Sequence, residues 1–182
     1  MPSPSTSTAT SLPLTDVTMD IRPATDADAT RLGELGALLV ELHHGFDAAR
    51  FLAPGPGTAR GYGGYLVSQI GQEDVLVLVA EDAGGVWGYV YGALEGADWM
   101  ALRGPAGVVY DLVVDPGRRR KGLGRRLLDE ALRILEQRGA PRVVLSTAEQ
   151  NTAAQSLFAA IGFRRTMIEM TRESGQEPSR SR

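Results

Sequence analysis

The sequence predicts a mixed α/β protein built on one sheet, and two observations support this fold class. Apolar runs of strand length alternate along the chain with runs whose apolar residues recur at helical spacing. Early in the chain a short turn joins two strand runs, whereas later a strand, a helix and a strand follow one another. We therefore expect a sheet that is antiparallel at first and has a strand–helix–strand unit in its middle.

The first half of the chain contains two helix patterns and a hairpin. Leucines at 32, 35, 39 and 42 form a helical stripe, and the Pro54-Gly55-Pro56-Gly57 run after it must be a loop. The run Val75–Val79 reads as a buried strand. The elements expected in order are a strand at 18–22, a helix from about 28 to 44, a loop at 47–60, a weaker helix at 62–70 and strands at 74–81 and 86–94.

The second half contains the central strand and the strand–helix–strand unit. A loop at 96–106 precedes a strand at 108–114, and the next helix stops at Gly139. Thr152 and Gln155 have the spacing of a capping box for a short helix that Gly162 ends. The elements expected are a strand at 108–114, a helix at 123–138, a strand at 142–146, a helix to 161 and a last strand at 163–171.

The segment Asp115–Gly124 joins the central strand to its helix and has the composition of an anion site. Backbone N–H groups at a helix N-terminus lack intrahelical partners and favour negative charge. Gly122 and Gly124 allow a ligand to approach the backbone, and the basic run Arg118–Lys121 adds charge. The loop alone is equally compatible with a solvated charged surface. Its spacing fits neither a Walker A loop nor a dinucleotide fingerprint.

Composition limits the classes of function. The chain has 182 residues, a formal net charge of −3 and no cysteine, which excludes disulfides and zinc–thiolate sites; no metal is expected. No apolar run approaches the roughly 20 residues of a membrane span, and no secretory signal is visible, so a cytoplasmic protein is expected. We expect a domain at 18–172 between a disordered tail at 1–17 and a polar tail at 173–182.

Two motifs resemble those of the GNAT N-acetyltransferase superfamily. One is Arg119-x-x-Gly122-x-Gly124 after the strand that ends in Asp115-Pro116, and the other is Asn151-x-x-Ala154-x-x-Leu157-Phe158-x-x-x-Gly162-Phe163. The order of elements also matches from about residue 19 to 172. The resemblance implies a GNAT-type fold, with a central mixed sheet of about six to seven strands flanked by helices on both faces, and acetyl-CoA as cofactor.

The resemblance also implies a set of cofactor contacts. The loop 119–125 would hold the pyrophosphate, and the backbone of 112–114 would pair with pantetheine as an added strand does, which requires the central strand to splay from the next. Asn151 would contact the pantetheine arm or the acetyl region, although a plain N-cap role has equal weight. The residues expected to bind the cofactor are Leu112, Val113, Val114, Arg119, Arg120, Lys121, Gly122, Leu123, Gly124, Arg125, Asn151 and Phe158.

The expected reaction is attack of a primary amine on the acetyl thioester. A lysine-like amine has a pKa of about 10.4, so a base must remove its proton near neutrality, and Asp111 is the first candidate. Many family members carry a tyrosine at the position of Phe158 as proton donor to the thiolate, and phenylalanine cannot donate. Tyr110 could replace it only if its side chain faces the cleft. Rival bases or cation binders are Glu41, Asp47, Glu95 and Asp98.

Two functions stay open at this point. The first is an N-acetyltransferase acting on a primary amine of a small molecule or peptide, favoured by the intact loop and by Asp111. The second is a catalytically silent acyl-CoA-binding module in sensing or assembly, favoured by Phe158. Nucleic-acid binding through the run 118–121 is a weaker third alternative, since the chain as a whole is acidic, and no nucleic-acid or membrane partner is expected. A homodimer is left open.

Overall fold

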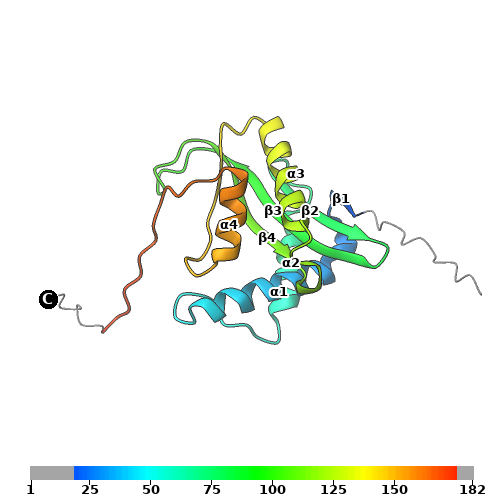
Figure 1. Ribbon diagram of the computed structural model, residues 1–182, viewed down its shortest axis with the longest axis horizontal. Coiled ribbons are helices and arrows are strands. Elements are labelled where there is room, and N and C mark those ends of the chain that lie inside the picture. Colours follow the sequence, from blue (N-terminus) through cyan, green and yellow to red (C-terminus); the bar gives the residue numbers. More distant parts are fainter. Residues whose placement is uncertain (1–18, 176–182) are drawn as a thin grey trace, which may run out of the picture.

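The computed structural model describes residues 19–175, and the predicted tail at 1–17 and most of the one at 173–182 lie outside this part. Figure 1 shows a sheet with helices on both faces. The strands are β1 (Asp20–Pro23), β2 (Val75–Asp82), β3 (Gly85–Glu95), β4 (Ala106–Val114) and β5 (Val143–Leu145). The α-helices are α1 (Ala29–Phe46), α2 (Thr58–Gln69), α3 (Leu123–Gln137) and α4 (Thr152–Ile161), with short 3-10 turns η1 (Asp26–Asp28) and η2 (Pro116–Arg118).

The five strands form one sheet in the order β1-β2-β3-β4-β5. The first four pair antiparallel, and β4 and β5 pair in parallel across the crossover helix α3. The prediction of an early antiparallel part and a later strand–helix–strand unit is therefore correct. The predicted number of strands, six to seven, is wrong, because the described residues form five.

The missing strand is the one expected at 163–171. These residues belong to no helix or strand and pair with no strand of the described chain. The physical reason lies in their pattern, because Met167 and Ile168 are adjacent and cannot both point to the same face of a strand. Beyond Phe163, every side chain of the segment is exposed. The segment therefore lacks the one-sided apolar face that would dock it against this sheet.

Two apolar cores lie on opposite faces of the sheet. One face packs against α3 and α4, with Leu127, Leu128 and Leu135 fully buried. The other face packs against α1 and α2, with Leu32, Leu35 and Leu66 fully buried. Glycines let α1 and α2 approach closely, since a Cβ on Gly36 would lie 2.2 Å from the Tyr62 ring. The tyrosine ring can therefore contact the backbone of α1 while its hydroxyl reaches Asp111 of β4.

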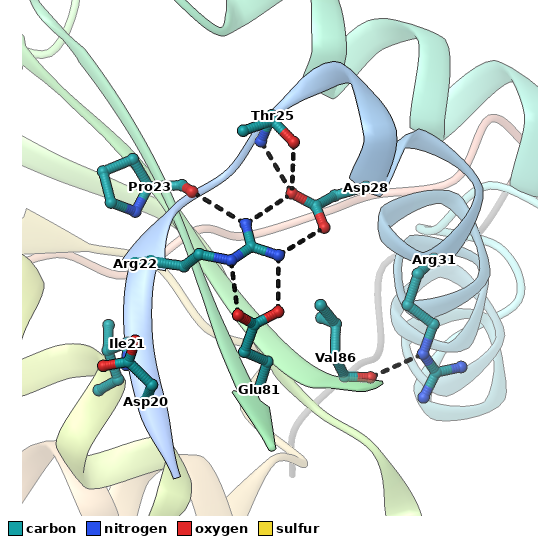
Figure 2. A network of polar contacts seen from close by, with 9 residues as sticks. All are labelled: Asp20, Ile21, Arg22, Pro23, Thr25, Asp28, Arg31, Glu81 and Val86. Atoms are coloured by element: carbon teal, nitrogen blue, oxygen red, sulfur yellow. Dashed lines mark hydrogen bonds and ion pairs between the residues drawn. The ribbon is translucent and has the colours of Figure 1, made fainter. Parts of the chain in front are cut away.

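Arg22 on β1 ties the outer strands to the start of α1. Figure 2 shows its guanidinium bound to Glu81 of β2 on one side and to Asp28 of η1 on the other. The Nε and one terminal nitrogen bind Glu81 at 2.8 and 2.7 Å, and the two terminal nitrogens bind Asp28 at 2.8 and 3.0 Å. A further bond to the Pro23 carbonyl satisfies the fifth donor. This network joins β1 and β2 to the residues that begin α1.

Candidate acyl-coenzyme site

The central strand β4 is paired on one side only over its second half. It pairs with β3 along its length, but its pairing with β5 covers only Gly107, Val108 and Val109. From Tyr110 to Val114 the β5 side of β4 has no strand partner in the described chain. The splay that the proposed pantetheine pairing requires is therefore present.

A register shift marks the point where the strands separate. Tyr91 of β3 lies opposite Asp111, whereas the next residue, Gly92, lies opposite Val109, so Tyr110 is an extra residue on β4. An extra residue of this kind bends the strand and reverses its inside–outside alternation. Val109 accordingly packs in the core under α3, and Asp111 turns to the opposite face, under α1 and α2.

The N-terminus of α3 lies directly after the open edge of β4 and offers free backbone donors. Its N-cap is Gly122, in the left-handed conformation with φ of 78°, and no side chain caps it. Within the described chain the N–H groups of Leu123, Gly124 and Arg125 have no acceptor. Three amides and the helix dipole therefore point toward one place, which is the arrangement that binds phosphate groups.

The basic residues before this helix have different partners. Arg118 binds Asp82 at 2.9 Å and lies over the Trp87 ring at 4.3 Å, so it anchors the turn to the β2–β3 hairpin. Arg119 donates from Nε to the Val114 carbonyl at 3.0 Å, which already gives that carbonyl a partner. Arg120 is exposed and has φ of 60°. The positive charge available to a ligand thus lies at residues 119–121.

A second ion pair anchors the same turn to α1. Asp115 accepts from the Gly117 amide at 2.8 Å and from Arg31 at 2.5 Å. Arg31 also donates to the Val86 carbonyl at 2.9 Å, as Figure 2 shows. The Arg31 guanidinium holds the pKa of Asp115 below its usual range. Two arginines on separate elements therefore fix the start of the loop before any ligand binds.

Asp111 is a buried carboxylate held by two tyrosines. Its Oδ2 accepts the hydroxyl of Tyr62 at 2.7 Å and that of Tyr89 at 2.9 Å. Its side chain is only 8% exposed, and burial raises the pKa of its carboxyl above the usual value, while the two hydroxyls oppose this shift. Burial also raises the pKa of both tyrosines, so they stay protonated donors at neutral pH.

Tyr110 lies beside this cluster but is turned toward Glu95. Its hydroxyl donates to Glu95, which also pairs with Arg103, and its ring lies 4.8 Å from that of Tyr91. Burial and the Glu95 carboxylate raise the pKa of Tyr110. Tyr110 could donate a proton to a thiolate only after its bond to Glu95 is broken.

The α4 helix meets the N-terminus of α3 on the other side of the site. Asn151, not Thr152, is its N-cap, with Oδ1 accepting the Ala154 amide at 3.2 Å. The predicted capping box is therefore wrong, and Gln155 instead donates to the carbonyls of residues 148 and 149. The loop 146–150 places the polar asparagine first, so the helix starts one residue earlier than the capping-box spacing indicates.

The other predicted residues are placed as follows. Phe158 is buried in the core against Phe163, at a ring distance of 6.0 Å. Arg125 is half exposed and lies 3.5 Å from Asp129. A Cβ on Gly124 would have ordinary contacts, 3.6 Å from both Leu157 and Val114. The loop 119–125 thus lies against the end of β4, through Arg119 and Gly124, and against Leu157 of α4.

Sequence reasoning missed Tyr89, Arg31 and the Asp82–Trp87 pair. Tyr89 binds Asp111, Arg31 binds Asp115 and Trp87 binds Asp82, and each bond joins two different elements. The one local signal is Asp115, a residue type that often caps a helix. Among the hydrogen bonds and ion pairs of the described residues, none joins the Asp111 carboxylate to a rival acid; these acids are Glu41, Asp47, Glu95 and Asp98. Glu95 instead accepts the Tyr110 hydroxyl.

These features fit a nucleotide-bearing acyl thioester. The uncapped N-terminus of α3 suits a pyrophosphate, and the unpaired β4 edge suits an extended amide-containing chain such as pantetheine. A family model described as the acetyltransferase (GNAT) family matches residues 49–163. The chain therefore belongs to the GNAT acetyltransferase family, and the predicted resemblance is confirmed. GNAT acetyltransferases use acetyl-CoA, so the cofactor prediction holds at the level of the family.

Curated relatives and solved structures agree with this assignment. The chain is 42% identical over 84 residues to a mycothiol acetyltransferase of Thermobispora bispora, covering 46% of this chain and 27% of that protein. A second mycothiol acetyltransferase, of Beutenbergia cavernae, is 42% identical over 73 residues, covering 40% of this chain and 25% of that protein. The chain thus spans about a quarter of the length of these relatives.

The structural neighbours share the fold at low sequence identity. A mutant of the BH1408 protein from Bacillus halodurans superposes with a TM-score of 0.72 at 21% identity, covering 85% of this chain and 98% of that one. The aminoglycoside N-acetyltransferase AAC(6')-Iy, in complex with CoA, gives 0.63 at 16% identity over 91% and 100% of the two chains. No helix among residues 19–175 is long and apolar enough to cross a membrane.

Proposed function

We propose that this protein transfers the acetyl group of acetyl-CoA to a primary amine by direct attack of the amine on the thioester. The observation that supports this most strongly is the uncapped, glycine-started N-terminus of α3 beside the open edge of β4, in a chain of the GNAT family. The pyrophosphate would lie on the amides of residues 123–125 and near Arg119, Arg120 and Lys121. Pantetheine would lie along Leu112 and Val113.

Asp111 is proposed to receive the amine proton, directly or through water. It lies two residues beyond Val109, the last residue of β4 that pairs with β5, and its raised pKa brings its affinity for a proton closer to that of an amine. Tyr62 and Tyr89 would hold the carboxylate in place and stabilise its charged form. Tyr110 stays a proposed proton donor, since Phe158 has no proton to give.

The acceptor is proposed to be a small-molecule amine, although a peptide amine fits the same chemistry. The curated relatives are named mycothiol acetyltransferase, and one structural neighbour is an aminoglycoside N-acetyltransferase, which supports a small molecule. Around Tyr110 the structure offers the aromatic rings of Tyr65 and Tyr91 and the carboxylate of Glu95. Aromatic faces and a carboxylate are the groups that attract a cationic amine.

The experiment that tests this function is release of free CoA thiol from acetyl-CoA across a panel of amines, with mass spectrometry of the products. The expected result is acetylation of at least one primary amine and none of the matching alcohols. Calorimetric binding of CoA without turnover of any amine would favour the silent acyl-CoA-binding module instead. Absence of CoA binding would overturn both.

A further inference from the structure

Lys121 is the single lysine of a chain that otherwise uses arginine for its basic side chains. Of the 19 lysine and arginine residues, all the others are arginines. The difference matters chemically, because a lysine side chain is a primary amine that can accept an acetyl group, whereas a guanidinium stays charged. The chain therefore carries one side chain of the kind that its own proposed reaction modifies.

The turn before α3 presents Lys121 to solvent. Arg120 and Gly122, on either side of it, both have left-handed backbone, with φ of 60° and 78°, so the chain bends sharply at this residue. The Lys121 side chain is exposed, and no hydrogen bond or ion pair holds its amine in the part of the chain that the structure describes. Arg118 and Arg119, by contrast, have partners. The amine of Lys121 is thus free to react.

The position of Lys121 ties its charge to the cofactor. It directly precedes Gly122, the N-cap of α3, and the amides of residues 123–125 are the proposed phosphate site. Acetylation of a lysine removes its positive charge. An acetyl group on Lys121 would therefore weaken the attraction for the pyrophosphate, while Arg119 and Arg120 would keep part of it.

The acetyl group for Lys121 has to come from another copy of the protein. Arg119 binds the Val114 carbonyl, so the loop lies at the end of β4 where the proposed pyrophosphate site begins. Asp111, at the proposed thioester end, lies three residues back along the strand, or about 10 Å at 3.3 Å per residue. A cofactor bound to one copy therefore holds its acetyl group away from Lys121 of the same copy.

The surface beside the proposed thioester end has the opposite charge to the basic loop. Glu95, which accepts the Tyr110 hydroxyl, and Asp98 have side chains that are 34% and 41% exposed. Both pair with Arg103, whose side chain is only 15% exposed. Two accessible carboxylates thus share one largely covered guanidinium. Such a surface attracts a loop that carries the charges of residues 119–121.

We propose that one copy of this protein acetylates Lys121 of another, and that the acetyl group lowers the affinity of the modified copy for acetyl-CoA. The inference rests on the proposed function, because it uses the same transfer to an amine. The uncharged Lys121 amine forms a C–N bond with the acetyl carbon, and the C–S bond breaks. The amine proton passes to Asp111 of the copy that catalyses and then to solvent, and the CoA thiolate takes up a proton and leaves as the thiol.

The test follows the full chain by peptide mass spectrometry after incubation with acetyl-CoA and no other amine. Native protein is expected to gain an acetyl group on Lys121, and its Kd for CoA in calorimetry is expected to rise several-fold over that before incubation. In Lys121→Arg the same incubation is expected to leave the Kd at its starting value. An affinity-tagged Asp111→Asn variant is expected to stay unmodified alone and to be acetylated at Lys121 when mixed with native protein.

The matched control is Arg133→Lys, which adds a second lysine on a regular part of α3 where the native side chain is 51% exposed. This added lysine is expected to stay unmodified under conditions that modify Lys121. Equal modification of both lysines, or modification of Asp111→Asn alone at the native rate, would show an uncatalysed reaction and overturn the proposal. Acetylated Lys121 with an unchanged Kd for CoA would refute its effect on the cofactor.

The CoA-release assay on the amine panel, run in parallel, separates this inference from the proposed function. Acetylation of a panel amine with Lys121 untouched would refute the inference and leave the function standing. Absence of both reactions would count against both.

Discussion

Replacing Asp111 with asparagine separates its chemical role from its structural one. Asparagine has nearly the same shape, and its Oδ1 can still accept the hydroxyls of Tyr62 and Tyr89. It cannot take up a proton from an amine. If Asp111 is the base, kcat/KM at neutral pH is expected to fall by about 10²–10⁴, the range for loss of general base catalysis.

The stability of this variant follows from the direction of the pKa shift. The carboxyl pKa of Asp111 is raised in the folded state, so between the unfolded and folded pKa values the folded state binds the proton more strongly. Folding stability contributed by Asp111 therefore falls as pH rises through that window. The uncharged asparagine removes this loss, and we expect the free energy of unfolding at pH 7 to be unchanged or higher in urea denaturation.

The matched control is Tyr62→Phe, which keeps the carboxylate but removes a bond that lowers its pKa. The acidic limb of the kcat/KM profile is expected to move to higher pH in this variant and to disappear in Asp111→Asn. An asparagine variant with activity within about threefold of the native protein, at equal stability, would refute the role of Asp111 as base.

Three further outcomes are expected. Gly124→Ala has room for its Cβ and is expected to change the affinity for CoA by no more than about threefold. Gly124→Asp is expected to weaken CoA binding at least about tenfold in calorimetry, because its carboxylate repels the pyrophosphate. Equal affinities of the two variants would contradict the pyrophosphate placement. Asp82→Asn releases Arg118 and is expected to raise the KM for acetyl-CoA several-fold with kcat nearly unchanged; a fall confined to kcat would argue against a role in positioning the loop. Arg22→Met is expected to lower the free energy of unfolding by about 2 kcal/mol at pH 7, because the buried Asp28 carboxylate loses its ion-pair partner. Since the ion pair lowers the pKa of Asp28, the difference in stability between the two proteins should disappear below about pH 4, where the carboxyl is protonated. A difference that is independent of pH in urea unfolding would count against the ion pair.

The elements that depend on local patterns could be predicted from the sequence. The hairpin, the central strand and α3 follow from periodicity and from turn residues within a few positions. The extra residue at Tyr110 could not be predicted, since it depends on how β4 lies against β3. Regular alternation along a strand would place Asp111 on the same face of the sheet as Val109. The sequence alone therefore does not predict that Asp111 is buried between Tyr62 and Tyr89 on the other face.

The candidate site shows the same division. The sequence indicates an anion site from four basic residues and two glycines, and the free amides at α3 agree with it. It cannot distinguish Arg118 from its neighbours, because the Asp82 and Trp87 side chains that hold Arg118 come from a distant hairpin. The predicted strand at 163–171 was wrong for a related reason, since a strand needs a partner as well as a suitable composition.

The open edge of β4 makes the proposed cofactor part of the folding equilibrium. The five residues 110–114 of this central strand have no strand partner on the β5 side in the described chain, and such an edge is a surface on which unfolded or partly folded chains can add. A ligand that pairs with that edge covers it and stabilises the native state by RT ln(1 + [L]/Kd), about 2.7 kcal/mol when the ligand is at 100 times its Kd. Depletion of acetyl-CoA would then lower the solubility and lifetime of the enzyme along with its rate, so the protein's abundance would follow the supply of its own donor.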